Sequence, residues 1–155
     1  MDLKVRAARP EDAKAIAGLS RELGYPSSLK AVRDRLRTVL ARDDQRLVVA
    51  ESPEGVVCGW LQAHSSLTVE TGLRVEIVGL IVSGAMRRRG VGRRLVAQAE
   101  IWASEISAET VVVRSNAART ESHSFYPSLG YLPSNPSLGY LPSKTQVVYR
   151  KRILI

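Results

Sequence analysis

The feature that most restricts the fold of this chain is an apolar strand that runs into a turn of arginines and glycines and then into a helix. Residues 73–82 end in IVGLIV, which is apolar on both faces and predicts a central strand flanked by helices. From residue 91 to 106 the apolar positions recur at helical spacing. A strand and a helix joined so directly predict a layered fold that contains both.

The rest of the chain alternates between the same two periods. Strands are predicted at residues 3–8, 47–51, 56–65, 110–113 and 145–150, and helices at residues 10–23, from Ser27 or Ser28 to residue 40, and up to Leu129 before Gly130. The predicted order is therefore β-α-α-β-β-β-α-β-α-β, which belongs to the α/β (α+β) class.

Length and composition predict one domain without a membrane span. The 155 residues suffice for one hydrophobic core, and no apolar run approaches the roughly 20 residues that cross a bilayer. Residues 1–9 lack the features of an export signal, and the lone Cys58, which we interpret as a small buried residue, fits a reducing compartment. We therefore expect residues 1–155 to form a single cytoplasmic domain that does not bind membranes.

The formal charge of +8, from 23 basic and 15 acidic residues, attracts anionic partners. Five arginines gather within residues 87–94 instead of spreading along a broad face. This grouping favours a local phosphate site and argues against nucleic acid as a partner. A basic nucleic-acid-binding module stays the alternative from another functional class.

The turn itself has the chemistry of a phosphate site. Glycines let the backbone turn tightly and approach a ligand, and the free N–H groups of a helix's first turn point toward an anion. Guanidinium groups add charge-assisted hydrogen bonds. The turn follows the pattern Arg-x-x-Gly-x-Gly, and the residues concerned are Arg87, Arg88, Arg89, Gly90, Val91, Gly92 and Arg93.

Two later segments extend this pattern: Arg114-Ser115-Asn116 at the end of a strand, and Phe125-Tyr126-x-x-x-Gly130-Tyr131. Together with the turn and the element order, they resemble the GNAT superfamily of acetyl-CoA-dependent N-acetyltransferases. The resemblance implies a mixed, mostly antiparallel sheet of about six or seven strands flanked by about four helices. It also implies acetyl-CoA as co-substrate and transfer of its acetyl group to the primary amine of a small molecule by direct attack in a ternary complex.

The resemblance also implies where the coenzyme binds. Residues 87–93 would hold its pyrophosphate, while the main chain at Leu80, Ile81 and Val82 would pair with the pantetheine arm beside a splayed neighbouring strand. Asn116 would help to hold that arm. Tyr126 would lie beside the sulfur and protonate the departing thiolate, the alternative being an ordinary core aromatic.

Glu76 is the residue we expect to act as base. A protonated amine cannot attack a thioester, so a carboxylate acting directly or through water must remove a proton near neutral pH. The sequence around Glu76 is similar to the catalytic strand of the histone-acetylating branch of the superfamily. The alternative is a carboxylate at the rim that pairs with Arg74.

Other catalytic classes are not supported. His64 and His123 are not spaced as metal ligands, so we expect no metal site, and His123 is either a lining residue of the acceptor pocket or a solvated one. The chain has neither a Gly-x-Ser-x-Gly elbow nor a Walker-type Gly-Lys-Ser/Thr.

The acceptor stays open at this point. The candidates are a polyamine or aminoglycoside, an amino acid, or a protein lysine. Two alternatives keep the fold: a protein lysine or N-terminal acetyltransferase, and an acyl-CoA-binding protein without turnover.

A short duplication interrupts the last third of the chain. The sequence PSLGYLPS occurs at residues 127–134 and again at 136–143. It is too short for a repeat architecture, and we expect it to lengthen one connection. Only the first copy has a tyrosine ahead of its proline, so the pattern above is aligned to that copy. A contact in a homodimer is the alternative role.

Overall fold

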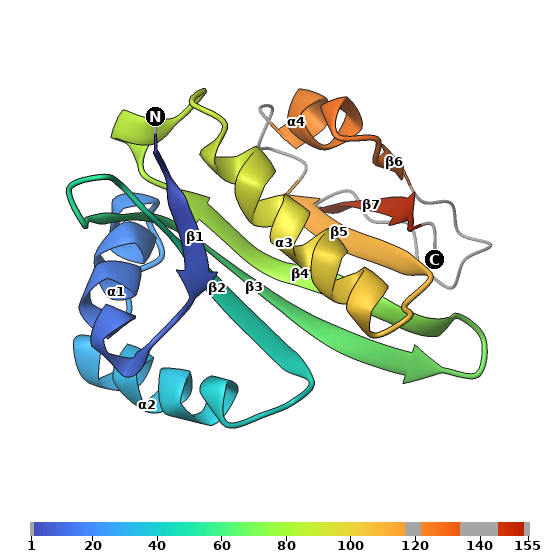
Figure 1. Cartoon of the computed structure of the whole chain (residues 1–155), viewed down its shortest axis with the longest axis horizontal. Coiled ribbons are helices and arrows are strands. Elements are labelled where there is room, and N and C mark those ends of the chain that lie inside the picture. The colour runs from blue at the N-terminus through green and yellow to red at the C-terminus, as the bar shows by residue number, and fades with distance from the viewer. Residues whose placement is uncertain (1, 117–121, 134–145, 154–155) are drawn as a thin grey trace. The chain divides into compact units, whose positions relative to one another are not determined.

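The computed structural model describes residues 2–116, 122–133 and 146–153. Within them the elements follow the predicted order, with two short 3-10 helices and one short strand, Leu132–Pro133, in addition (Figure 1). The helices are η1 (Pro10–Asp12), α1 (Ala13–Glu22), α2 (Leu29–Leu40), η2 (Gly84–Met86), α3 (Val91–Glu105) and α4 (Ser122–Ser128). The strands are β1 (Lys4–Ala7), β2 (Gln45–Glu51), β3 (Val57–Thr68), β4 (Gly72–Val82), β5 (Thr110–Asn116), β6 (Leu132–Pro133) and β7 (Gln146–Arg152).

These strands form a 7-stranded sheet in the order β1-β2-β3-β4-β5-β7-β6. The pairs β1–β2, β5–β7 and β6–β7 are antiparallel, and β4–β5 is parallel. The predicted class, a mixed sheet with flanking helices, is confirmed. The chain divides into two compact units: unit 1 is Met1–Ala63 with Gly79–Gln98, and unit 2 is His64–Val78 with Ala99–Ile155.

In unit 1, the two N-terminal helices begin and end at the residues that favour such ends. Pro10 opens η1, where its missing N–H costs no hydrogen bond. The Ser28 hydroxyl caps α2 by accepting a hydrogen bond of 3.0 Å from the Ala31 N–H. Apolar residues of both helices pack with β2 and β3 in one core, which contains Ala8, Ala13, Ile16, Leu36, Leu47 and Val49, with Leu29, Val32, Val39, Val57 and Trp60 against it.

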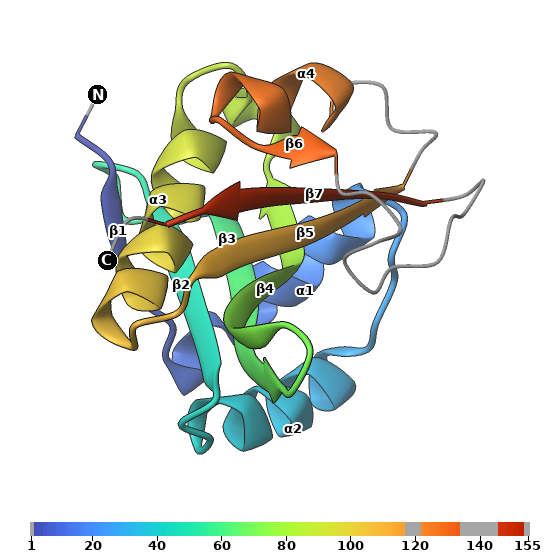
Figure 2. The same cartoon turned by 90° about the vertical axis from the view of Figure 1, so that its right-hand side faces the viewer.

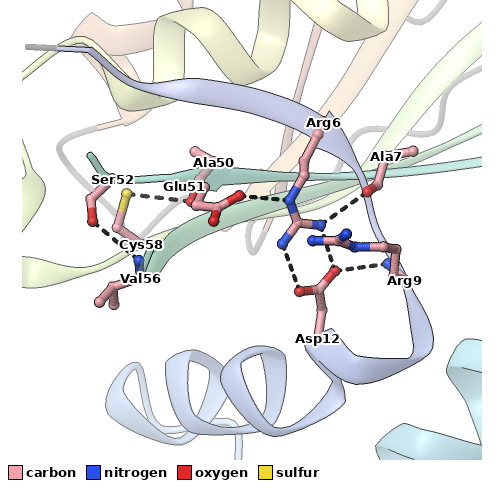
Figure 3. A network of polar contacts seen from close by, with 9 residues as sticks. All are labelled: Arg6, Ala7, Arg9, Asp12, Ala50, Glu51, Ser52, Val56 and Cys58. Atoms are coloured by element: carbon pink, nitrogen blue, oxygen red, sulfur yellow. Dashed lines mark hydrogen bonds and ion pairs between the residues drawn. The ribbon is translucent and has the colours of Figure 1, made fainter. Parts of the chain in front are cut away.

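The half-buried guanidinium group of Arg6 connects three segments of unit 1 (Figure 3). Arg6 on β1 donates through Nε to Glu51 Oε2 on β2 at 2.8 Å, and through Nη1 and Nη2 to the two oxygens of Asp12, each at 2.9 Å. Asp12 also accepts from the Arg9 N–H at 2.7 Å. Burial raises the pKa of Asp12, but the hydrogen bonds from Arg6 and from the Arg9 backbone outweigh it, so this pKa lies below its ordinary value.

The Trp60 side chain and Gly79 meet within unit 1. A Cβ placed on Gly79 would lie 2.7 Å from Cζ3 and 2.8 Å from Cη2 of the Trp60 ring. Such distances are far below van der Waals contact, so a glycine is required at this position of β4. The ring thereby packs directly over the β4 backbone.

Unit 2 has its own apolar interior. Val111, Val112 and Val113 of β5 are buried, and so are Trp102 and Ala103 of α3. Figure 2 shows β5, β7 and β6 side by side, with α4 lying next to β6. Tyr126 of α4 packs against the ring of Tyr149 of β7, with centroids 5.5 Å apart.

Several boundaries differ from the predicted ones. The run IVGLIV suggested that both faces of the second half of β4 are buried. Val78 is 47% exposed, so one of these faces is not fully covered. β5 continues past the β-branched run at 110–113 to Asn116, where the motif Arg114-Ser115-Asn116 had placed the strand end, because it pairs with β7 along its whole length. The first copy of the duplicated segment supplies β6, and the second copy lies outside the described residues.

No helix in the described ranges is both long enough and apolar enough to cross a membrane.

Candidate active site

The arginine and glycine turn follows β4 and η2 in unit 1 and ends where α3 begins at Val91. Two of its residues have left-handed backbone: Gly90 with φ of 80° and Arg88 with φ of 63°. Glycine adopts this conformation without cost, whereas arginine does not. The Arg94 N–H donates to the Gly90 carbonyl at 3.1 Å, so the helical hydrogen bonds start from Gly90. The N–H groups of Val91, Gly92 and Arg93 precede that bond and point out of the helix end.

The side chains of this turn divide between core and solvent. Val91 is buried and anchors the helix start, whereas Arg87, Arg88, Arg89 and Arg93 are exposed. Among the described residues none of these four arginines has an acidic partner. They surround the exposed N–H groups with positive charge. Exposed helix N–H groups among guanidinium groups form an arrangement suited to a phosphate or pyrophosphate.

The fifth arginine of the cluster has another role. Arg94 Nη1 donates to the Leu3 carbonyl at 2.6 Å, so this guanidinium ties α3 to the start of the chain. Arg94 was not among the residues predicted to hold the anion, and this hydrogen bond gives it a structural role. Its side chain is already engaged within the fold.

The end of β4 contains Leu80, Ile81 and Val82. Ile81 is buried, and the other two are half-buried. Directly after them, the Ser83 N–H donates to the Cys58 carbonyl of β3 at 2.8 Å. The register of β4 with β5 covers Arg74–Ile77 and Thr110–Val113, and both strands continue beyond it.

Glu76 lies in unit 2 and is 9% exposed. Both of its carboxylate oxygens accept hydrogen bonds of 3.0 Å from Nη1 of Arg114 on β5. The His64 Nε2 on β3 lies 3.8 Å from Oε2. Glu76 therefore forms a close ion pair with Arg114, whereas the alternative drawn from the sequence had named Arg74. A local sequence signal could not reveal this partner, because it lies 38 residues away on another strand.

Tyr126 is buried on α4 among three other aromatic rings. Its centroid lies 4.9 Å from that of Phe125, 6.0 Å from Tyr131 and 5.5 Å from Tyr149. Its carbonyl accepts from the N–H groups of Leu129 and Tyr131, which closes the turn after the helix. The packing holds the ring in one orientation.

A second buried polar group in unit 2 escaped the sequence analysis. The Tyr131 hydroxyl donates to Glu100 Oε2 at 2.9 Å, and Lys151 Nζ lies 3.1 Å from Glu100 Oε1. Burial and the charge of Glu100 raise the pKa of Tyr131 well above its ordinary range. This residue therefore stays a neutral donor. Its hydrogen bond joins Glu100 of α3 to the segment between α4 and β6, and Lys151 joins the same carboxylate to β7.

Two other predicted positions fall at the edge of what the structure describes. Asn116 is the last residue of β5 and pairs with Gln146 of β7, but its side chain lies outside the described residues. The same holds for the side chain of His123, which belongs to α4.

Comparison with known families gives one match over most of the chain. The model of the acetyltransferase (GNAT) family matches residues 14–131. That range contains the arginine and glycine turn, Glu76 and Tyr126. Comparison with curated protein sequences finds no match.

Solved structures share the fold at low sequence identity. The PaiA N-acetyltransferase from Thermoplasma acidophilum, in complex with coenzyme A, is 14% identical with a TM-score of 0.78, over 98% of this chain and 99% of that one. A GNAT superfamily phosphinothricin acetyltransferase from Sinorhizobium meliloti, in complex with AcCoA, is 18% identical with a TM-score of 0.79, over 99% and 89%. A mutant spermidine N-acetyltransferase from Vibrio cholerae is 13% identical with a TM-score of 0.76, over 97% and 93%. At these identities the likeness establishes the fold alone.

Proposed function

The chain belongs to the acetyltransferase (GNAT) family, and we propose that it transfers the acetyl group of acetyl-CoA to the primary amine of a small molecule. The structural neighbours include one bound to coenzyme A and one bound to AcCoA, which supports this coenzyme as the donor. The family match over residues 14–131 also supports the view that residues 1–155 act as one N-acetyltransferase domain.

The observation that carries this proposal is the turn at residues 87–93. A left-handed Gly90 leads into α3, and the free N–H groups of Val91, Gly92 and Arg93 lie among four exposed arginines. A pyrophosphate needs several converging donors, and this turn supplies both backbone and guanidinium donors. The residues we assign to the coenzyme here are Arg87, Arg88, Arg89, Gly90, Val91, Gly92 and Arg93.

The rest of the coenzyme would follow the main chain. We assign its pantetheine arm to the backbone of Leu80, Ile81 and Val82, in the manner of an added strand. The described pairing of β4 with β5 ends at Ile77, which supports this assignment. Asn116 at the end of β5 completes the set.

Acetyl-CoA supplies the acetyl group as a thioester, and the chain's own groups manage the protons. Glu76 accepts a proton from the acceptor ammonium, so that the free amine attacks the thioester carbon. The new C–N bond replaces the C–S bond, Tyr126 donates a proton to the leaving sulfur, and the second proton that the nitrogen loses restores Tyr126, while the proton on Glu76 passes to solvent. Arg114 uses only part of the acceptor capacity of Glu76, since each carboxylate oxygen can accept two hydrogen bonds. The products are the N-acetylated amine, coenzyme A and one proton.

Two measurements test this function. Calorimetry at low salt should detect acetyl-CoA binding to the protein, and this binding should weaken in a double variant Arg87→Gln/Arg89→Gln. The control is Arg42→Gln, which removes the same kind of charge from an exposed pair with Asp44. No heat of binding with the unmodified protein would contradict the proposal.

Turnover is tested separately by release of the coenzyme thiol with a panel of amines. Glu76→Gln should lower kcat by about 100-fold or more, because it removes the proton acceptor. The acetyl-CoA affinity of this variant should stay unchanged. An unchanged kcat would remove Glu76 from the mechanism, while thiol release by the parent protein would still support the enzyme.

A further inference from the structure

The strand register of unit 2 places Glu76 on the same face of the sheet as four arginines. Directly paired residues of neighbouring strands point to the same side, and residues two apart along a strand do so as well. Glu76 is paired with Val112, which is paired with Arg150; Arg74 is paired with Thr110, which is paired with Arg152. Arg114 follows Val112 by two residues. We call the four arginines on this side of the sheet the arginine face; they are Arg74, Arg114, Arg150 and Arg152.

The arginine face has a strong excess of positive charge. In the paired segments of β4, β5 and β7, Glu76 is the single acidic side chain. It is paired with Arg114. Arg150 and Arg152 are exposed, and neither has an acidic partner within the described part of the chain. Lys151 between them points to the opposite face, where it pairs with Glu100.

This charge pattern bears on the acceptor. We infer that the acceptor amine carries a carboxylate or phosphate group, which Arg150 and Arg152 bind while the amine lies at Glu76. This inference rests on the proposed function and deepens it by naming the acceptor class. Guanidinium groups bind these two anions through paired hydrogen bonds, so they recognise the shared feature of both.

The spacing suits a small molecule. β4 and β7 are separated by β5, so the backbones at Glu76 and Arg150 lie about 10 Å apart. The long arginine side chain can shorten this distance. An amine and an anionic group a few bonds apart can therefore reach both ends at once.

The same charges disfavour polycationic acceptors. A polyamine would bring several ammonium groups to a surface where one carboxylate stands among four guanidinium groups. Like charges at such distances repel, and partly buried pairs are screened little by salt. Polyamines should therefore be poor substrates.

The experiment compares matched amines with and without the anion. Phosphoethanolamine is compared with ethanolamine for the phosphate arm, and L-alanine with L-alaninamide for the carboxylate arm, with spermidine as the polycation. The readout is kcat/KM from thiol release. At least one anionic member should exceed its neutral partner by about 10-fold or more, since a hydrogen-bonded ion pair of this kind discriminates by about 10- to 100-fold.

Variants then assign the effect to the face. Arg150→Gln should lower kcat/KM for the preferred anionic amine by about 10- to 100-fold, mainly through KM. It should leave kcat/KM for the neutral amine and the affinity for acetyl-CoA unchanged. Arg150→Lys should recover part of the loss, and the control Arg42→Gln, which changes the net charge equally, should have no effect.

Failure of this inference is distinguishable from failure of the function. Equal or better turnover of the neutral amines or of spermidine would overturn it and leave the transferase intact. If no amine is acetylated, the proposed function fails. The inference is then tested by equilibrium binding of the anionic amines to the parent protein and to Arg150→Gln. Binding unaffected by Arg150→Gln would overturn it. A second result would also overturn the inference: the Arg150→Gln variant loses binding of an oligonucleotide but keeps binding of the anionic amines.

Discussion

Replacing Gly79 by alanine adds one methyl group where the neighbouring strand leaves no space. The new Cβ would lie 2.7 Å from Cζ3 of Trp60, about 1 Å inside normal carbon–carbon contact. The Trp60 ring cannot simply move away, because it packs against the core formed by β2, α1 and α2. Either β4 or this core must shift.

The size of the effect follows from two opposing terms. Overpacking of this kind lowers the free energy of unfolding by about 1–3 kcal/mol. Alanine also reduces the conformational freedom of the unfolded chain, which raises the free energy of unfolding by about 0.4–1 kcal/mol. We expect a net loss of about 1–2 kcal/mol in the free energy of unfolding. For a chain of this size, that loss lowers Tm by about 2–8 °C.

Urea denaturation followed by tryptophan fluorescence and by circular dichroism measures this loss. Coincidence of the two curves checks that unfolding is two-state. Gly18→Ala is the matched control, because no atom lies within 4 Å of its added Cβ in α1. In the interior of a helix that substitution should stabilise by about 0.5–1 kcal/mol.

A double variant identifies the clash. Trp60→Phe lacks the outer ring that carries Cζ3 and Cη2, so Gly79→Ala should cost less in the Trp60→Phe background. A coupling of about 0.5–3 kcal/mol is expected for residues in contact. If Gly79→Ala unfolds at the same urea concentration as the parent, or if its cost is the same in both backgrounds, the steric explanation is wrong.

Two further predictions concern buried polar groups. Tyr131→Phe removes the hydroxyl that donates to Glu100 and should lower the free energy of unfolding, measured by urea denaturation, by about 1–3 kcal/mol. The control Tyr25→Phe, at a 53% exposed site, should cause no measurable loss. Equal losses in the two variants would refute the role of that hydrogen bond. The pKa of Asp12 is lower in the folded than in the unfolded state, so its ionised carboxylate contributes to the free energy of unfolding above the unfolded pKa. This contribution is lost as the pH falls through the folded pKa. The difference in stability between the parent and Asp12→Asn should therefore shrink below about pH 4. A difference independent of pH between 7 and 3 would contradict this explanation.

Much of the fold follows from local sequence signals. Pro10, Ser28 and Gly24 mark helix ends because each favours a particular backbone or capping geometry, and the structure uses them there. The switch between periods of two and 3.6 residues separates strands from helices, since each element buries one face. The order of elements was therefore predictable from the residues, whereas the mixed sheet was implied by the resemblance to the GNAT superfamily.

The contacts within the candidate site were less predictable. Glu76 and Arg114 are joined by the register of β4 and β5, which is decided by packing and leaves no mark in the adjacent sequence. Arg74 is nearer along the chain, so it was the partner named in the alternative interpretation of Glu76. The exposure of Val78 shows the same limit, because an apolar side chain does not reveal whether anything covers it.

The hydrogen bond from Arg94 to the Leu3 carbonyl has a practical consequence for coenzyme titrations. Arg93, the neighbour of Arg94 in α3, belongs to the proposed pyrophosphate site. An affinity tag fused before β1 would disturb Leu3, the residue just ahead of the strand whose carbonyl holds this guanidinium in place. If that bond were released, the charged Arg94 side chain would be free to turn toward the coenzyme, and the tagged protein would bind anions more tightly than the native chain. Affinities should therefore be measured after the tag has been removed.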